Sequence, residues 1–128
     1  MILPAERNQP GKQTVALKQN HVFRRLYSKG KSAGDPYLAV YCRKNRLGHS
    51  RLGLTVGVKI GKAVVRNRTR RRIKEAYRVN EARFLPGYDL VIVARVRAGH
   101  SRYREIERSL LRLMDKLGLL ACKEEGQA

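Results

Sequence analysis

The stretch that organises the fold is residues 51–78, RLGLTVGVKIGKAVVRNRTRRRIKEAYR, in which a strand pattern runs directly into a helix pattern. The even-numbered positions from Leu52 to Val58 are aliphatic, whereas the odd-numbered positions are small or basic. This alternation predicts a strand with one buried face. Gly53 and Gly57 leave the other face without bulk, which often marks close approach by a ligand or another backbone. Gly61 then separates the strand from a long helix.

The helix after Gly61 is predicted to bury one stripe and to expose a strongly basic surface. At about 100° per residue, the stripe gathers Val65, Thr69, Ile73 and Ala76, flanked by Tyr77 and Asn80. The opposite side carries Arg66, Asn67, Arg70, Arg71, Lys74 and Arg78. Cations at i,i+4 spacing repel one another, and an ordinary solvated face mixes both signs. A polyanion lying along the helix would release its condensed counterions, so the pattern predicts a nucleic-acid-binding surface.

Length and composition indicate one folded domain with a polyanionic partner. The chain has 128 residues, a formal net charge of +19 and a pI near 11.0. No apolar run is long enough for a membrane span, and residues 1–7 do not resemble a secretory signal. Cys42 and Cys122 lack the spacing of zinc ligands, and Cys42 is interpreted as a small buried hydrophobe. We expect a reducing, cytoplasmic location.

Periodicity divides the chain into a flexible N-terminal tail at 1–13, an RNA-binding α+β domain at 14–118 and a C-terminal tail at 119–128. The expected elements are a short extended piece at 14–17, a helix from 20 that stops at Gly30, a basic loop at 28–36, strands at 37–43 and 51–59, the basic helix, a strand at 88–95 and a helix at 101–117. The order α-β-β-α-β-α describes a single-domain, two-layer sandwich. Helices on one side of the sheet would leave part of its other side open.

The first helix carries two stripes that point in different directions. Val22 and Leu26 form one stripe, and Phe23 and Tyr27 form the next, rotated by about 100°. Either all four side chains lie in the core, which spacing alone favours, or the aromatic pair lies at the rim of a groove where bases stack. Tyrosines of the next strand and the bare face of strand 51–59 would complete such a groove.

Residues for catalysis are sparse. His21, His49 and His100 are scattered, with no carboxylate placed to orient a base. A metal-independent ribonuclease could use His49, His100 and a lysine, since both histidines fall in expected loops. The 10 acids form no cluster suited to a metal pair, and no phosphate-binding or dinucleotide-binding glycine motif occurs. We therefore expect no catalytic residue and no protein-bound metal.

Over residues 17–117 the sequence resembles the protein component of bacterial ribonuclease P. The most specific match is the triplet Arg66-Asn67-Arg68 within GKAVVRNRTRRRIK at 61–74, preceded by RLGLTV at 51–56. The pattern formed by Leu17, Lys18, Phe23, Tyr27 and Gly30 also fits, as does the strand YDLVIV at 88–93. An Arg-Asn-Arg triplet alone is a weak signal. After such a strand, and continued by further basic residues, it is a strong one.

The resemblance implies a ribonucleoprotein that removes the 5′ leader from precursor tRNA, in which the RNA subunit with bound Mg²⁺ performs the hydrolysis. It implies that the catalytic RNA is contacted by Arg66, Asn67, Arg68, Arg70, Arg71 and Lys74. It implies a cleft for the single-stranded leader, lined by Phe23, Tyr27, Tyr41, Thr55 and Lys59, with Tyr37 competing for the place of Tyr41. The resemblance therefore favours a position at the rim of a groove for Phe23 and Tyr27 over a position in the core.

The resemblance also implies a left-handed β-α-β connection across the basic helix, opposite to the general rule. Two positions depart from the family pattern. Arg72 stands where the family often has an apolar residue, and Tyr27 replaces the commoner phenylalanine with an added hydroxyl.

Two further functions are compatible with the sequence. A ribosomal or other structural RNA-binding protein would have a similar composition, and a stand-alone histidine ribonuclease would use the histidines. A helix-turn-helix DNA reader fits less well, because a strand rather than a short helix precedes the basic helix.

Overall fold

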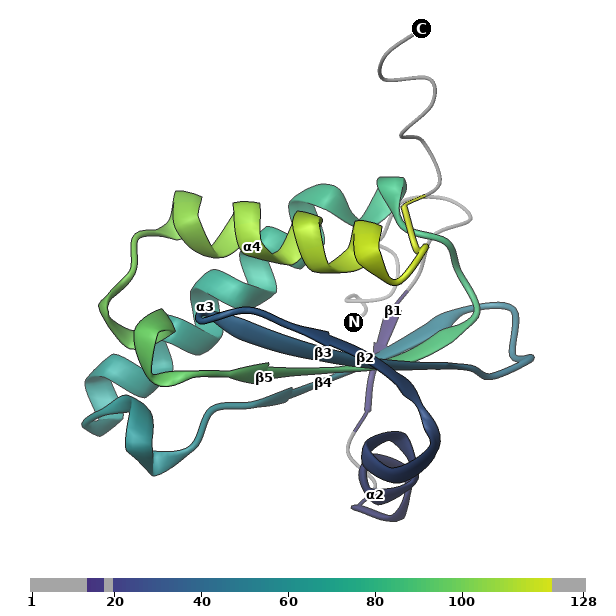
Figure 1. The fold of residues 1–128 in the computed structure, drawn as a ribbon, viewed down its shortest axis with the longest axis horizontal. Helices are drawn as coiled ribbons and strands as arrows, with labels where there is room; N and C mark the ends of the chain where they lie inside the picture. Colours follow the sequence, from purple (N-terminus) through teal and green to yellow (C-terminus); the bar gives the residue numbers. More distant parts are fainter. Residues whose placement is uncertain (1–13, 18–19, 121–128) are drawn as a thin grey trace, which may run out of the picture.

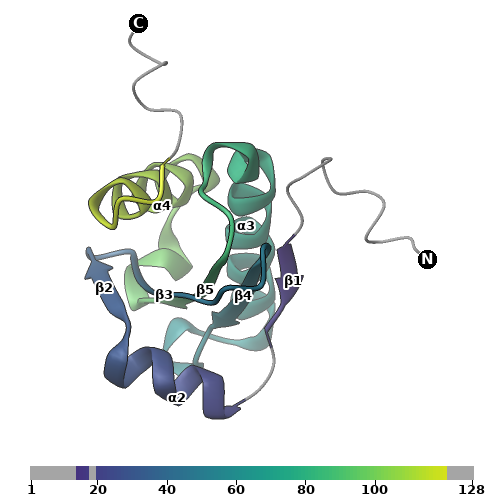
Figure 2. The same ribbon diagram turned by 90° about the vertical axis from the view of Figure 1, so that its right-hand side faces the viewer.

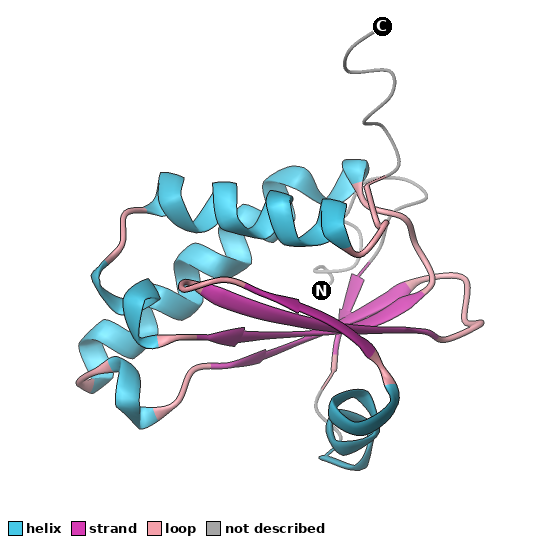
Figure 3. Ribbon diagram, in the orientation of Figure 1, coloured by secondary structure: helices cyan, strands magenta, loops and turns pink. Residues whose placement is uncertain are grey.

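The structure is a computed structural model that describes residues 14–17 and 20–120, with only the backbone at positions 20 and 21. Its strands are β1 (Thr14–Ala16), β2 (Lys31–Gly34), β3 (Leu38–Lys44), β4 (Ser50–Thr55) and β5 (Tyr88–Ala94). Its α-helices are α2 (Asn20–Lys29), α3 (Ala63–Asn80) and α4 (Tyr103–Lys116), and short 3-10 helices are η1 (Val58–Ile60), η2 (Glu81–Arg83) and η3 (Val96–His100). Figure 3 shows the strands in one sheet, with the helices on its two sides.

The strands form one mixed sheet in the order β1-β4-β5-β3-β2. Strand β5 pairs parallel with β4 and antiparallel with β3, so it lies inside the sheet. Its residues Leu90, Val91 and Ile92 are buried, which confirms the central strand predicted from a sequence that is apolar on both faces. The short extended piece at 14–17 is confirmed as β1, which pairs parallel with β4.

Helices cover both faces of the sheet. Figures 1 and 2 show α3 and α4 on one face and α2 across the other. The larger core lies under α3 and α4, and a smaller one joins Leu17, Val22, Leu26 and Val91 under α2. The expectation of helices on one side only was therefore wrong. Because β5 is apolar on both faces, each face requires its own cover.

The β-α-β unit made by β4, α3 and β5 has the unusual hand that the family resemblance implied. The two strands are adjacent and parallel, and α3 crosses between them on the α4 side of the sheet (Figures 1 and 2). In Figure 2 the chain passes from β4 up to α3 and then to β5, which lies to the left of β4. Followed along the strand direction, this path turns anticlockwise, which makes the crossover left-handed. Most crossovers between parallel strands are right-handed.

Two other expectations were wrong. The loop expected at 28–36 contains β2, whose backbone pairs antiparallel with β3. This edge strand is mostly exposed, so no apolar alternation reveals it in the sequence. The last helix, expected from 101, begins at Tyr103 after the N-cap Arg102, whose backbone N–H donates to Glu105 Oε1 at 2.8 Å.

The folded core extends past position 118. Gly118, with φ +77°, ends the turn after α4. Leu119, expected in the C-terminal tail, is buried, and Leu120 forms a β-bridge with Phe84. The chain thus folds back over η2 before the described residues end.

Candidate nucleic-acid interface

The packing of α3 leaves one face of the helix to solvent. Its predicted stripe is confirmed, with Val65 half-buried and the rest buried: Thr69, Ile73, Ala76, Tyr77 and Asn80. Within the described part of the chain, the ion pairs are Arg51–Asp89, Arg78–Glu75 and Arg112–Asp35. Of the basic residues on α3, only Arg78 thus has a carboxylate partner. The positive charge of the remaining cations is not compensated by the described chain.

Two arginines of α3 turn toward the segment before α4. Arg68 Nη2 donates to the carbonyl of Gly99 at 3.3 Å, and Arg72 Nη1 donates to that of Ser101 at 2.6 Å. Arg72, whose place differs from the family pattern, therefore ties α3 to η3. The Nε atoms of Arg66 and Arg68 are buried without a hydrogen-bond partner among the described residues. A buried donor without a partner carries an energetic cost.

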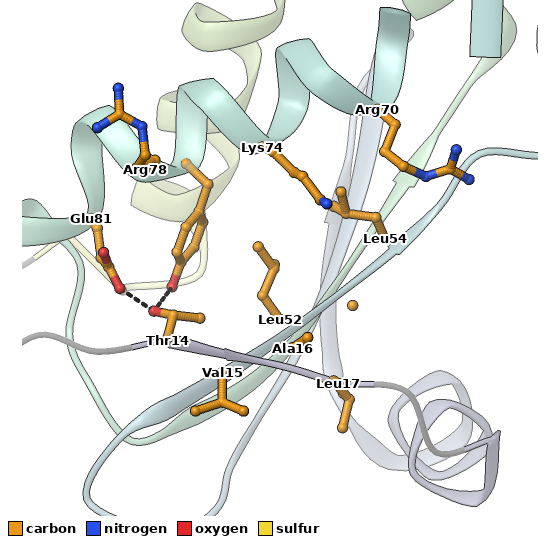
Figure 4. A pocket seen from close by; sticks show the side chains of 12 residues that line it. Thr14, Val15, Ala16, Leu17, Leu52, Leu54, Arg70, Lys74, Arg78 and Glu81 are labelled. Carbon is orange, nitrogen blue, oxygen red and sulfur yellow. Dashed lines mark hydrogen bonds between the residues drawn. The ribbon is translucent and has the colours of Figure 1, made fainter. Parts of the chain in front are cut away.

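A pocket of about 420 Å³ lies beneath α3, at the β1–β4 edge of the sheet. Figure 4 shows Arg70, Lys74 and Arg78 projecting from successive turns of α3 above an apolar wall that includes Leu52 and Leu54. The spacing of four residues puts the three cations in one row. The row therefore follows a groove with an apolar floor.

One end of this pocket is closed by the polar groups of Thr14, Tyr77 and Glu81, of which only Tyr77 was predicted from the sequence to lie beside the buried stripe. Thr14 Oγ1 hydrogen-bonds to Tyr77 Oη at 3.1 Å and to Glu81. Burial raises the pKa of Tyr77 to about 12, so the phenol is neutral at physiological pH. The i,i+4 spacing of Tyr77 and Glu81, the C-cap of α3, is the signal that could have placed both on one side at the end of the helix.

The residues expected to line the leader cleft include a contact cluster on the opposite face of the sheet, between α2, the middle of β3 and the end of β4. The rings of Tyr27 and Tyr41 meet edge to face, with centroids 4.9 Å apart. Tyr27 Oη lies 3.4 Å from Thr55 Oγ1, and the Tyr27 side chain is 43% exposed. Phe23 is half-buried beside them, and Lys59 is exposed on η1. We call Phe23, Tyr27, Tyr41, Thr55 and Lys59 the aromatic cleft, after the leader-binding cleft that the family resemblance implies.

The structure separates the two tyrosines that competed for the cleft. Tyr41 lies against Tyr27, whereas Tyr37 packs with the larger core beneath Arg97, whose Cζ is 5.4 Å from the ring centroid. Val22 and Leu26 are 7% and 1% exposed. The two stripes of α2 therefore differ, since the aliphatic one is buried and the aromatic one reaches the surface.

Residues of the same chain occupy the space that the missing side chain of Gly53 leaves on β4. A Cβ atom on Gly53 would lie 2.5 Å from Phe23 Cζ and 3.2 Å from the carbonyl oxygen of Leu17. The close approach predicted at Gly53 is thus made by Phe23 and not by an external ligand. At Gly57 nothing lies within 4 Å of an added Cβ.

The histidines do not form a catalytic pair. His49 lies in the β3–β4 turn, whereas His100 ends η3, beyond the opposite end of the sheet (Figure 1). The side chain of His21 is outside the described residues. Among the residues that the structure describes, no group of three or more His, Cys, Asp or Glu is arranged to hold a metal ion.

The ribonuclease P family model matches residues 12–118 of this sequence, which includes α3 and the aromatic cleft. The chain is a member of the ribonuclease P protein family. It is 43% identical over 105 residues to the ribonuclease P protein component of Clostridioides difficile strain 630, with 81% of this chain and 92% of the relative covered. The corresponding protein of Natranaerobius thermophilus is 40% identical over 108 residues, covering 84% and 94%.

Solved ribonuclease P proteins have the same fold. The Staphylococcus aureus protein superimposes with a TM-score of 0.76 at 31% identity, covering 82% of this chain and 96% of that one. The Thermotoga maritima protein gives a TM-score of 0.72 at 30% identity, covering 79% and 96%. As a ribonuclease P protein component, the chain is a subunit of a tRNA-processing ribonucleoprotein and has an RNA partner. The described helices include none that is both long and apolar enough to span a membrane.

Proposed function

We propose that this chain binds the catalytic RNA of ribonuclease P through α3 and the 5′ leader of precursor tRNA in the aromatic cleft. In this way it assists the endonucleolytic 5′ maturation of tRNA in the cytoplasm. The observation that carries the proposal is the uncompensated positive charge of α3. A short stretch of chain connects this helix to the half-exposed aromatic cleft.

The surface for the catalytic RNA consists of Arg66, Asn67, Arg68, Arg70, Arg71 and Lys74. Guanidinium groups bind phosphate through two parallel hydrogen bonds, and the buried Nε donors of Arg66 and Arg68 lack a partner within the described chain. Phosphate oxygens would accept from the exposed cationic groups of this surface and offset the repulsion along the helix. The RNA would thus stabilise the helix that binds it.

The leader surface is the aromatic cleft. Stacking on aromatic rings holds single-stranded bases with little regard to sequence, and the exposed Tyr27 offers such a ring. Thr55 ends β4, Lys59 follows on η1, and Arg66 lies in the first turns of α3. A leader that leaves the cleft past Lys59 would therefore arrive at the proposed catalytic-RNA surface.

The RNA subunit carries the chemistry in this proposal, and Mg²⁺ is held mainly by that RNA. The protein contributes no catalytic group. Its cations would lower the repulsion between the RNA, the substrate and the phosphates that hold metal, so less free Mg²⁺ would be needed. This role requires only exposed positive charge, which α3 supplies.

Reconstitution tests the proposal. Purified chain is mixed with a bacterial ribonuclease P RNA, and cleavage of precursor tRNA is followed across a Mg²⁺ series. We expect the chain to speed correct 5′ cleavage at low Mg²⁺ and to cleave nothing without the RNA. An unrelated protein of similar charge is the control.

Each of the other two outcomes would support one of the alternative functions. Cleavage by the chain alone would establish a protein ribonuclease. Stimulation no greater than that of the control would leave a structural RNA-binding protein.

A further inference from the structure

A second basic surface lies between α2 and the β3–β4 turn. It is a pocket of about 620 Å³, lined by Val22, Arg25, Leu26, Arg43, Lys44, Asn45, Arg46, Arg51 and Asp89. We call it the turn pocket. It contains five cations, from α2, β3, the β3–β4 turn and β4, and none of its residues belongs to the surfaces described above.

The positive charge of the turn pocket is almost uncompensated. Asp89 is the one acid among its described lining residues. Both carboxylate oxygens of Asp89 accept from Arg51, at 2.8 Å each, and Oδ1 also accepts from Asn45 Nδ2 at 2.9 Å. Within the described chain, no ion pair involves the other four cations. Arg25, Arg43, Lys44 and Arg46 therefore face solvent beside an acid that is already neutralised.

The turn that carries these cations is held in one conformation by Asn45. Its Oδ1 accepts from the backbone N–H of Leu47 at 2.8 Å, and its Nδ2 donates to the carbonyl of His49 at 3.0 Å. Its backbone N–H donates to Gly87 at 2.9 Å, and the next residue, Arg46, has φ +64°. The backbone of the turn is thus positioned before any ligand arrives, which lowers the entropic cost of binding.

The composition of the pocket indicates which part of an RNA it fits. None of the described residues that line it is aromatic, so it offers no ring for base stacking. Guanidinium and ammonium groups fit phosphate oxygens, which are the same for every sequence. The pocket therefore suits an RNA backbone better than unpaired bases.

We propose that the turn pocket is a second RNA-binding surface, which grips the phosphodiester backbone of RNA without reading its sequence. This proposal rests on the proposed function, because it assumes that RNA is the partner. Strand β4 starts at the turn pocket and ends near the aromatic cleft, and its six residues span roughly 17 Å at about 3.3 Å per residue. The protein would then hold RNA at both ends of the sheet, with the cleft side and the turn pocket gripping separate segments.

The test replaces three exposed cations of the turn, in the variant Arg43→Gln/Lys44→Gln/Arg46→Gln. Arg51 is kept because its ion pair is structural. The matched control removes the same charge from the exposed face of α4, as Arg104→Gln/Arg108→Gln/Lys116→Gln. The dissociation constant for ribonuclease P RNA, and that of the reconstituted complex for precursor tRNA, are measured across a salt series.

We expect the turn variant to weaken binding to at least one of the two RNAs and to flatten the salt dependence by up to about 0.7–0.9 log units per lost phosphate contact. The RNA affected identifies which molecule supplies the backbone. The variant Arg43→Lys/Arg46→Lys keeps the charge and should retain most of the affinity. Thermal unfolding of each variant shows that the loss does not come from unfolding.

The proposal is overturned if the turn variant matches the α4 control for both RNAs. That result would leave the proposed function intact, because the α3 and cleft variants described in the Discussion test it independently. Conversely, a chain that fails to stimulate ribonuclease P RNA in reconstitution would fail the proposed function whatever the turn variant does.

Discussion

At the scale of single residues, the absence of one side chain determines how the aromatic cleft is built. Phe23 occupies the space that a Cβ atom on Gly53 would need. This contact brings α2 close to the sheet and turns Tyr27 toward Tyr41 and Thr55. A small substitution at Gly53 should therefore act on the cleft through Phe23.

We expect Gly53→Ala to displace Phe23 and to lower the free energy of unfolding by about 1–3 kcal/mol, the usual cost of overpacking. Gly57→Ala is the control on the same segment, because its added Cβ meets nothing within 4 Å and its φ of −79° suits alanine. Chemical denaturation measures both. Equal stability of the two variants would show that Phe23 does not depend on Gly53.

The aromatic pair itself gives a second prediction at this scale. Phe23→Ala with Tyr27→Ala should weaken binding of precursor tRNA to the reconstituted complex more than that of mature tRNA, because only the precursor has a leader. Loss of stacking costs on the order of 1–3 kcal/mol per base. Tyr27→Phe keeps the ring and serves as control. Equal losses for both tRNAs, or global unfolding, would support a purely structural role.

At the scale of elements, α3 combines two tasks on one helix. Ile73 and Ala76 are fully buried against the core, while the other side carries the cations. Since neighbouring cations repel, the helix relies on its packing and on the hydrogen bonds that Arg68 and Arg72 make to the η3 side. The charge is best explained by the RNA partner of the family.

Replacing Arg66, Arg70 and Lys74 by Ala should weaken binding to ribonuclease P RNA. It should also flatten the salt dependence by up to about 0.7–0.9 log units per lost phosphate contact. The matched control removes Arg104, Arg108 and Lys116 from α4 in the same way. Binding is measured over a salt series, and an unchanged slope would remove α3 from the interface.

At the scale of the whole molecule, the half-buried Asp35 connects the sheet to α4, and the buried Asp89 connects neighbouring parts of the sheet. Asp35 accepts from Ser109 Oγ at 2.6 Å and from Arg112 Nη2 at 3.1 Å, which ties the sheet to α4. Asp89 joins β5 to Arg51 on β4 and to Asn45 in the turn. Burial alone would raise the pKa of each acid. The hydrogen bonds outweigh burial and hold the pKa of both below the ordinary value of 3.8.

A lowered pKa means that the unfolded chain binds more protons than the folded one near that value. The stability that Asp35 and Asp89 contribute should thus be complete above about pH 5 and should fall as the pH drops through 4 and below. Unfolding free energies of the parent and of Asp35→Asn/Asp89→Asn are compared between pH 7 and pH 2. The variant should be less stable at pH 7 and should show a flatter pH dependence. Parallel curves would contradict this account.

Local pattern determined much of this protein. The alternation of residues 51–58, the period of α3, the apolar run of β5 and the density of positive charge are properties of neighbouring residues, so they could be read directly. The motif around Arg66, Asn67 and Arg68 then pointed to the ribonuclease P family, which the comparisons confirm. Burial of Cys42 was also predictable, because it occupies an apolar position of a strand.

Other features were decided only by the tertiary structure, because they depend on residues that are distant in the chain. Only its backbone pairing with β3 makes β2 a strand. Helix α2 covers the second face of the sheet because the side chain of Val91 on β5 lies on that face and needs an apolar cover. The choice of Tyr41 over Tyr37 depends on where α2 lies. The turn pocket collects cations from α2, β3 and β4, and only the folding of these elements onto one sheet brings their charges together.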